Sequence, residues 1–172
     1  DYKKIDGSFT FYYHKETNDY LMEILPSQMG EIFLLNLTRD SGDGYYLDAG
    51  SMLNEFPFII NKVGNRIQII NKNIKFRVDS SKAFSKSLDN LSNSLVSSAL
   101  IKSEPNIETG SVLVDLSDLF INDLEYLRQK SNGKFVLDKK NSFFTSIKSF
   151  PLNSEIEVSL HFMTKKYKYV YT

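Results

Sequence analysis

The sequence predicts an α+β fold, in which mostly antiparallel sheets carry two helices packed on a sheet face. Short runs of alternating apolar and polar residues recur along the 172-residue chain, as strands with one solvent-exposed face require. Phe (13) and Tyr (10) are plentiful while Gly (8) and Pro (4) are few, a composition that favours sheets. One longer segment repeats its apolar residues every three or four positions, which indicates a helix lying on a sheet.

The first forty residues predict three strands joined by short turns. Residues 9–13 alternate with strand periodicity, and residues 16–19 carry the Asn and Asp that tolerate a left-handed turn. Residues 21–24 then form the returning strand of a hairpin. Pro at the start of residues 26–29 and Gly after their end predict one helical turn. The uninterrupted apolar run of residues 32–37 predicts a central strand covered on both faces.

The next segment predicts a loop, a hairpin and one further strand. Residues 39–50 (RDSGDGYYLDAG) have the composition of a loop. Residues 56–61 and 66–70 flank Val63-Gly64-Asn65, where Gly supplies the positive φ of a hairpin turn. From Ile74 to Val78, apolar residues alternate with Lys and Arg, which predicts a strand with one solvated face.

An apolar stripe then gives the clearest helix signal in the chain. Four residues follow one another at spacings of four, three and four: Phe84, Leu88, Leu91 and Leu95. This spacing places them on one side of a helix, which we expect to cover a sheet face. Ser80 or Ser81 is the expected N-cap.

A second helix is predicted after a short strand over residues 112–116. The apolar residues of 119–121 and 124–127 form this helix, and Ser117 or Asp118 is its expected cap. The two helices are the ones expected to pack on the sheet.

Strand patterns finish the chain, at residues 135–137, 143–150 and 155–163. In the last of these, the apolar residues from Ile156 to Phe162 face one way, and the polar residues from Glu155 to His161 face the other. Residues 165–172 continue to alternate up to the final Thr, so we expect the chain to be a fragment of a longer protein.

Composition limits the domain count and the class of protein. The length suits a single domain over residues 1–172. Lys and Arg (21) balance Asp and Glu (21), which argues against a nucleic-acid binder and against a polybasic membrane patch. Without Cys, the chain has no disulfide, thiol nucleophile or thiolate metal site. No apolar run approaches the roughly 20 residues of a membrane span, and the first residues do not resemble a signal peptide.

The candidate metal ligands are few and scattered. His14 and His161 are the only histidines, and no H-E-x-x-H places two imidazoles one helical turn apart. We therefore expect His161, on the polar face of a strand, to be solvated or paired rather than bound to zinc. Asp40 to Gly44 resembles a fragment of a calcium loop but lacks the closing bidentate Glu, so a polar surface loop is expected, with ion binding left open.

The other catalytic patterns are equally incomplete. No G-x-S-x-G elbow and no G-x-x-x-x-G-K phosphate loop occurs. Glu155 and Glu157 lie on one face of a strand, about 7 Å apart. That separation falls within the range of inverting glycosidases, but alternating Glu on a solvated strand face is the expected interpretation. The sequence thus predicts no catalytic residue, no cofactor-binding residue and no metal ligand in this chain.

Tyrosines leave two interpretations open. Six of them lie near strand ends and loops: Tyr12, Tyr45, Tyr46, Tyr167, Tyr169 and Tyr171. They form either an aromatic binding surface or half-buried positions on a sheet, because Tyr suits both.

Several segments, in order and spacing, match a family pattern over about residues 4–164. The parts that carry the resemblance are residues 7–13, 19–24, 26–30, 33–35, Arg39, 73–77 (NIKFR), 114–120 (VDLSDLF), 138–142, Lys148 and 150–156 (FPLNSEI). Together they resemble the uncharacterised amino-terminal domain that precedes the catalytic domain in metzincin-type zinc-dependent metalloproteases of bacteria, common in Bacteroidetes.

The resemblance implies secretion to the periplasm or cell surface, with zinc only in a downstream domain. In that family the catalytic H-E-x-x-H-x-x-G-x-x-H lies downstream of this region, and none of it is present here. No catalytic or zinc-binding residue is therefore carried over onto this sequence. The resemblance itself implies no known biochemical role for the domain.

Three functions follow as expectations. The first is a non-catalytic accessory domain that packs against a downstream catalytic domain of the same polypeptide and shapes its cleft, with a peptide substrate as a second partner. The alternative is a free-standing cell-envelope module that binds peptide or glycan. A small hydrolase is least supported, because no nucleophile–base signature exists. A downstream H-E-x-x-H-x-x-G-x-x-H would favour the first over the second.

Overall fold

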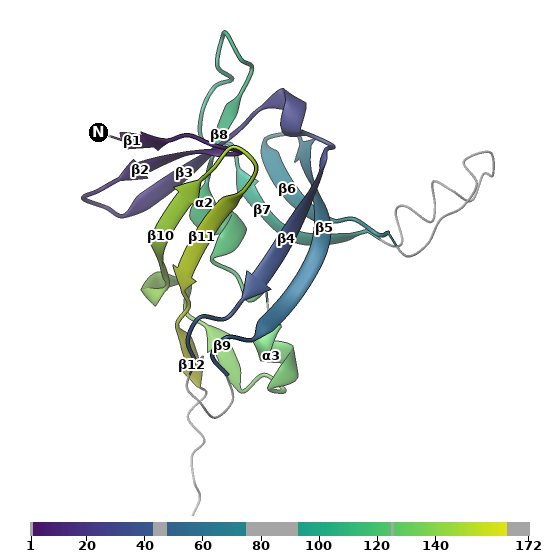
Figure 1. Cartoon of the computed structure of the whole chain (residues 1–172), viewed down its shortest axis with the longest axis vertical. Helices are drawn as coiled ribbons and strands as arrows, with labels where there is room; N and C mark the ends of the chain where they lie inside the picture. The colour runs from purple at the N-terminus through teal and green to yellow at the C-terminus, as the bar shows by residue number, and fades with distance from the viewer. Residues whose placement is uncertain (1, 43–47, 75–92, 125, 165–172) are drawn as a thin grey trace, which may run out of the picture. The chain divides into compact units, whose positions relative to one another are not determined.

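The structure is a computed structural model that describes residues 2–42, 48–74, 93–124 and 126–164 (Figure 1). Strands hold 52% of these residues and helical turns 11%. The described residues form four separate sheets, and their two α-helices contain only five and four residues. The predicted α+β fold with two helices packed on a sheet is therefore wrong, and the described chain is mostly β.

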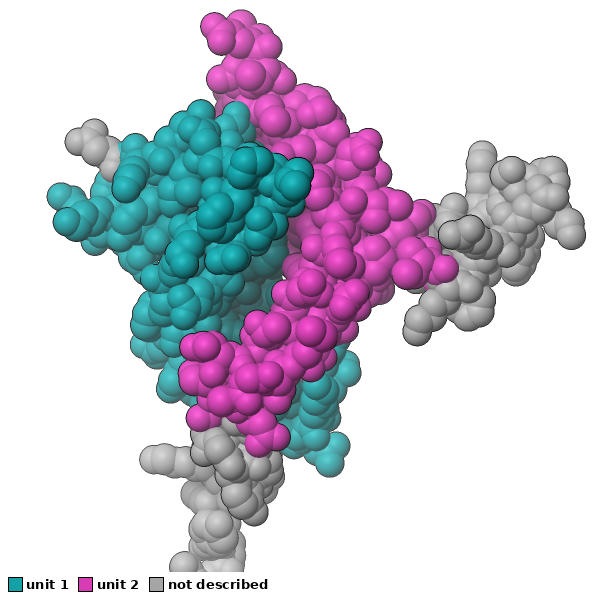
Figure 2. Space-filling view, in the orientation of Figure 1, with its two compact units in different colours: residues 1–23, 113–172 teal, residues 24–112 magenta. Residues whose placement is uncertain are grey.

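The chain forms two compact units, coloured separately in Figure 2. Unit 1 combines residues 1–23 with residues 113–172, and unit 2 consists of residues 24–112. Unit 1 is thus made from two pieces of chain, whereas unit 2 is continuous. The expectation of a single domain stays a prediction.

The first sheet of unit 1 has the strand order β1-β2-β3-β8. Its strands are β1 (Tyr2–Ile5), β2 (Thr10–His14), β3 (Asp19–Ile24) and β8 (Val112–Asp115). The predicted β2–β3 hairpin is confirmed: His14 pairs with Asp19, and Asn18 adopts a left-handed φ of 58° in the turn. One face of this sheet contributes fully buried side chains to the core, namely Phe11, Met22 and Val114.

Two antiparallel strand pairs complete unit 1. β10 (Phe143–Ser149) pairs with β11 (Ser154–Ser159), and β9 (Phe135–Leu137) pairs with β12 (Phe162–Thr164). The strand predicted over residues 155–163 is therefore two strands with different partners. The predicted alternation is nevertheless confirmed along it, since Glu155 and Glu157 are exposed while Ile156 and Val158 are half-buried.

The helices of unit 1 are single turns that extend the strand ends. α2 (Leu116–Phe120) begins after Asp115, whose carboxylate accepts a 2.9 Å hydrogen bond from the Ser117 N–H. The cap is therefore Asp115, and the prediction of Ser117 or Asp118 is wrong. α3 (Leu127–Lys130) is separate from α2 because Ile121 and Tyr126 both leave helical geometry, so the continuous second helix is also wrong.

Close packing joins the β1–β2 connection to the β10–β11 hairpin. The Ser8 N–H donates to the Phe150 carbonyl at 2.6 Å, and the hydroxyls of Ser8, Ser149 and Ser154 form a chain with O···O distances of 2.8 Å. Gly7 lies so close to Ser149 that a Cβ on it would be 2.5 Å from the Ser149 carbonyl carbon. Glycine is thus required here by the close approach of two backbones.

Unit 2 contains one four-stranded antiparallel sheet in the order β4-β5-β6-β7. Its strands are β4 (Ile32–Thr38), β5 (Met52–Val63), β6 (Arg66–Asn71) and β7 (Ser94–Leu100), and the single turn η1 (Pro26–Gln28) precedes them at the predicted position. The inner face buries Phe56, Phe58, Ile60, Ile67, Ile69 and Ala99. The predicted β5–β6 hairpin is confirmed, with Gly64 at φ 56° in the first turn position, as in a type II′ turn.

β4 differs from its prediction as a central strand covered on both faces. It is the edge strand of the sheet, and its residues alternate between exposed and half-buried. The exposed fractions of Ile32 and Leu34 reach 62% and 60%. An apolar run indicates burial but does not say on how many faces, which is why the prediction failed.

The predicted apolar helix also conflicts with the structure at its carboxyl end. Leu95 lies in β7, where it pairs with Ile70 of β6. The remainder of that stripe (Phe84, Leu88 and Leu91) falls outside the described residues, as do Phe76 and Val78 and the alternating segment 165–172. Pairing with β6 explains the difference, because this long-range contact places Leu95 in a strand although its spacing from Leu91 also fits a helix.

Candidate functional site

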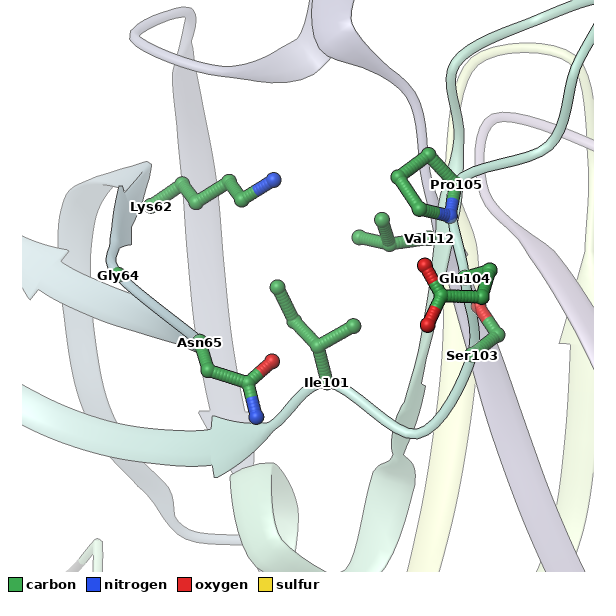
Figure 3. Close-up of a pocket in the computed structure, with 8 residues that line it drawn as sticks. All are labelled: Lys62, Gly64, Asn65, Ile101, Ser103, Glu104, Pro105 and Val112. Atoms are coloured by element: carbon green, nitrogen blue, oxygen red, sulfur yellow. The ribbon is translucent and has the colours of Figure 1, made fainter.

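A hollow of about 190 Å³ lies in unit 2, at the end of the β5–β6 hairpin (Figure 3). One side is formed by the hairpin and the other by the chain that leaves β7. Its lining residues are Lys62, Gly64, Asn65, Ile101, Ser103, Glu104, Pro105 and Val112. Residues of the β5–β6 hairpin and of the segment after β7 therefore line one small hollow.

Backbone hydrogen bonds fix both sides of this hollow. The Ile101 N–H donates to the Asn65 carbonyl at 3.1 Å, which joins the chain after β7 to the hairpin turn. The loop beyond Pro105 closes on Asn106, whose N–H donates to the Ser111 carbonyl at 2.8 Å. The Asn106 side-chain oxygen also accepts from the N–H groups of Glu108 and Thr109, at 2.9 and 3.1 Å. Hydrogen bonds within the loop, and one to the hairpin turn, thus hold both walls of the hollow in place.

Two opposite charges point into the hollow. Figure 3 shows the Lys62 ammonium and the Glu104 carboxylate directed into it from opposite sides, with Ile101 between them at the base. Both residues are exposed, and within the part of the chain that the structure describes neither forms an ion pair. The arrangement can attract a charged ligand, and its lining contains no imidazole or second carboxylate for acid–base chemistry.

A second polar cluster surrounds Asp138 in unit 1. Its carboxylate accepts from the Asn141 amide at 2.5 Å and from the Lys140 N–H at 3.2 Å, and it lies 3.3 Å from His161 Nδ1. These hydrogen bonds lower the pKa of Asp138 below its usual value of 3.8, and the one from Asn141 has the largest effect. His161 is thus a pairing histidine whose side chain is 54% exposed.

The same cluster contains a serine, but its geometry is not that of a hydrolase triad. The buried Ser142 hydroxyl donates to the Asp138 carbonyl at 2.8 Å and accepts from the His161 backbone N–H at 3.0 Å. The Asp138 N–H in turn donates to the His161 carbonyl at 2.8 Å. The hydroxyl therefore contacts the His161 backbone instead of its imidazole, and the cluster fastens the residues before β12 to those after β9.

The comparisons give the chain a family. Residues 50–172, most of the chain, match the family described as Domain of unknown function (DUF5117). The chain belongs to the DUF5117 family. No curated protein and no solved structure matches it. The family description carries no link to metalloproteases or to Bacteroidetes.

Both polar centres of this DUF5117 domain lie within the matched residues. Neither Lys62 nor Glu104 was singled out from the sequence, because a charged residue in a turn carries no periodic signal. The hairpin signal at Gly64 was the one sequence feature that pointed to this place. Asp138 and His161 were noted separately in the sequence, and the structure brings them together.

The remaining candidate residues have ordinary surroundings. The ring of His14 meets that of Tyr2 edge-on at a centroid distance of 5.1 Å, and its Nδ1 lies 3.1 Å from the Thr17 hydroxyl. Glu155 and Glu157 face solvent, and Glu155 is opposite Lys148 in the β10–β11 pair. No group of three potential metal ligands occurs among the described residues.

Two further groups of candidates are only partly described. Asp43 and Gly44 of the suggested calcium loop fall outside the described residues, as do Tyr45, Tyr46, Tyr167, Tyr169 and Tyr171. The half-buried Tyr12 donates its hydroxyl to Glu23 at 3.1 Å, and burial together with this carboxylate raises the pKa of Tyr12. Within the described part of the chain, no helix is long and apolar enough to cross a membrane.

Proposed function

We propose that this DUF5117 domain is a non-catalytic accessory domain of a secreted zinc metalloprotease. In this proposal it packs against the catalytic domain that follows in the same polypeptide and shapes the cleft that receives a peptide substrate. Zinc belongs to that downstream domain, and the protein acts in the periplasm, at the cell surface or outside the cell. The observation that supports a packing role is an apolar row on the outer face of unit 2.

The apolar row crosses all four strands of the unit 2 sheet. The strand registers place Ile32 opposite Ile59, Ile59 opposite Ile70, and Ile70 opposite Leu95. The two ends of the row, Ile32 and Leu95, are 62% and 57% exposed. Leu34, which is 60% exposed, lies on the same face opposite Pro57. Ile59 and Ile70, in the middle of the row, are half-buried. Apolar patches with exposed side chains mark surfaces that contact another protein.

The edge of the same sheet supports the proposal. β4 has the sequence IFLLNLT and carries neither a charge nor a proline. Natural proteins usually protect an exposed edge strand with Lys, Pro or a bulge, because unpaired N–H and C=O groups invite further strands. Here the only irregularity is the register shift at Leu37–Thr38. An edge with so little protection is expected where another part of the polypeptide covers it.

The catalytic domain is the proposed partner because of the resemblance described above, which includes residues 114–120 and 150–156 of unit 1. The apolar row carries no charge, so it suits a permanent contact within one polypeptide better than a transient, electrostatically guided one.

Hydrogen exchange on the full polypeptide, compared with the 172-residue chain alone, tests the proposal. The Ile32–Thr38 amides should exchange more slowly in the full polypeptide, because the partner domain excludes water from β4. The double variant Ile32→Ser/Leu95→Ser should abolish that added protection and lower proteolytic activity. Ile107→Ser is the matched control, since Ile107 is a fully exposed isoleucine in a loop of unit 2.

Two outcomes would contradict the proposal. The first is a full polypeptide that lacks a zinc protease domain after this chain. The second is equal exchange of the β4 amides in both forms, which would favour a free-standing binding module instead.

A further inference from the structure

We infer that the hollow in unit 2 binds a small zwitterion with an apolar side chain, either a free α-amino acid or a short peptide. Glu104 would receive the ammonium group, Lys62 the carboxylate, and the base of the hollow the side chain. This inference does not rest on the proposed packing role, because the hollow and the apolar row share no residue.

The charges argue for a ligand that carries both signs. Lys62 and Glu104 point into one hollow and, among the described residues, neither forms an ion pair. Elsewhere in the chain an exposed pair does form, since Lys4 and Asp6 approach to 2.8 Å. A ligand with one charge would pair with one side chain of the hollow and repel the other. A zwitterion pairs with both, which is the arrangement that electrostatic complementarity favours.

The base of the hollow argues for an apolar side chain on the ligand. Ile101 lies at the bottom, Val112 is 1% exposed, and Pro105 forms part of one wall. Pockets for drug-sized ligands usually measure roughly 300–1,000 Å³. A volume of about 190 Å³ is smaller than that range and suits a ligand of about one residue.

The hollow is also held in shape before any ligand arrives. Gly64, at φ 56°, permits the tight turn that places Lys62 and Asn65 on the same side. The Asn65 carbonyl accepts a 3.1 Å hydrogen bond from the Ile101 N–H, which holds the hairpin turn against the base of the hollow. Because the walls are fixed by backbone bonds, a ligand has little ordering cost to overcome. Both charges are exposed, however, so binding should be modest and should weaken with salt.

A titration followed by NMR of the backbone amides tests this inference. The probes are L-leucine, L-leucyl-L-leucine, L-leucinamide, which lacks the carboxylate, and N-acetyl-L-leucine, which lacks the ammonium group. Leucine or its dipeptide should shift the amides of Asn65, Ile101 and Glu104. Each blocked compound should bind at least about tenfold more weakly, because it loses one charge-assisted contact. Tighter binding of leucine identifies a free amino acid as the ligand, and tighter binding of the dipeptide identifies a peptide.

Variants of the two charged residues provide the second arm. Lys62→Met and Glu104→Gln should each weaken binding of the better probe about tenfold. Lys3→Met and Glu55→Gln, which change exposed residues outside the hollow, should leave it unchanged. The inference is overturned if neither zwitterion shifts these amides at about 10 mM, which corresponds to a negligible affinity. It is equally overturned if the blocked compounds bind as well as the zwitterions, a result that does not depend on how any variant folds.

Discussion

Units 1 and 2 use their polar and apolar side chains in opposite ways. In unit 1 the polar groups bond to one another: the hydroxyls of Ser8, Ser149 and Ser154 form one chain, and the groups around Asp138 form another. In unit 2 the inner sheet face is buried, but the ends of an apolar row are exposed on the other face. The two charges in the hollow form no ion pair with any residue that the structure describes.

The difference follows from how each unit is connected. Unit 1 joins two distant pieces of chain, and Ser8 and Ser154 are 146 positions apart. Its serine hydroxyl chain fastens those two pieces together, while the Asp138 cluster fastens two segments of the second piece. The sheet of unit 2 consists of four consecutive strands held by their backbone ladders. Its strands need no such bonds between distant pieces of chain, so binding is expected from unit 2 and structural cohesion from unit 1.

Replacing Ile60 with Ala should have the largest effect on stability and would test the two faces of the unit 2 sheet. Ile60 is fully buried on the inner face, and its truncation should lower the free energy of unfolding by about 2–5 kcal/mol. Ile32→Ala, on the exposed row, should change it by no more than about 0.5 kcal/mol. Denaturant melts of the isolated chain measure both, and equal losses would mean that the row is covered.

In unit 1, Gly7→Ala should lower stability by about 1–3 kcal/mol because of overpacking. The added Cβ would be 2.5 Å from the Ser149 carbonyl carbon and 2.6 Å from its Cβ. Adding Ser149→Ala should not restore stability, since the backbone carbon remains in place. Thermal unfolding of the single and double variants makes the comparison, and full rescue would show that only the hydroxyl is in the way.

Ser142→Ala should cost about 1–3 kcal/mol, because it removes two internal hydrogen bonds, each with a usual net value of about 0.5–1.5 kcal/mol. It removes the hydroxyl between the Asp138 carbonyl and the His161 N–H. Chemical denaturation gives the loss, and amide exchange at His161 should become faster. Unchanged exchange at that amide would argue that water replaces the hydroxyl without cost.

The smallest expected effect is a pH dependence that originates at Asp138. Its pKa is depressed in the folded state, so the stability that it contributes is present above its usual pKa of 3.8. This contribution is lost as the pH falls from 3.8 through the lower pKa that Asp138 has in the folded state. The difference in unfolding free energy between the wild type and Asp138→Asn should therefore be constant above about pH 5 and shrink below pH 3.8. A difference that stays constant down to pH 2 would contradict the role of this carboxylate.

Local turn chemistry made part of the fold predictable. Gly64 and Asn18 adopt the positive φ that their turns were expected to need, and the hairpins on either side of them are confirmed. These features depend on a few neighbouring residues, so a single sequence contains the information. The alternation from Glu155 to Phe162 was correct for the same reason, although the chain changes partner strand within it.

Features set by distant residues were not predictable. Within the described residues β4 is an edge strand of its sheet. Its composition could not predict this position, because strand order depends on the whole sheet. The spacing of Leu95 from Leu91 fits a helix, but the pairing of Leu95 with Ile70 places it in a strand. Lys62 and Glu104 form one hollow only because Ile101 bonds to Asn65, a contact without a signature in either segment.

The division of unit 1 into two pieces has a consequence for synthesis on the ribosome. The sheet of unit 2 has all its strands once Leu100 has emerged, whereas β3 waits for β8 and Ser8 waits for Ser154. Contacts between residues so far apart in sequence form slowly, because closing a long loop costs entropy before any contact is gained. Strands β1 to β3 are thus made before the strands of unit 2 but must wait with the edge of β3 unpaired. Unit 2 can therefore complete its sheet before unit 1, although its first strand is made later.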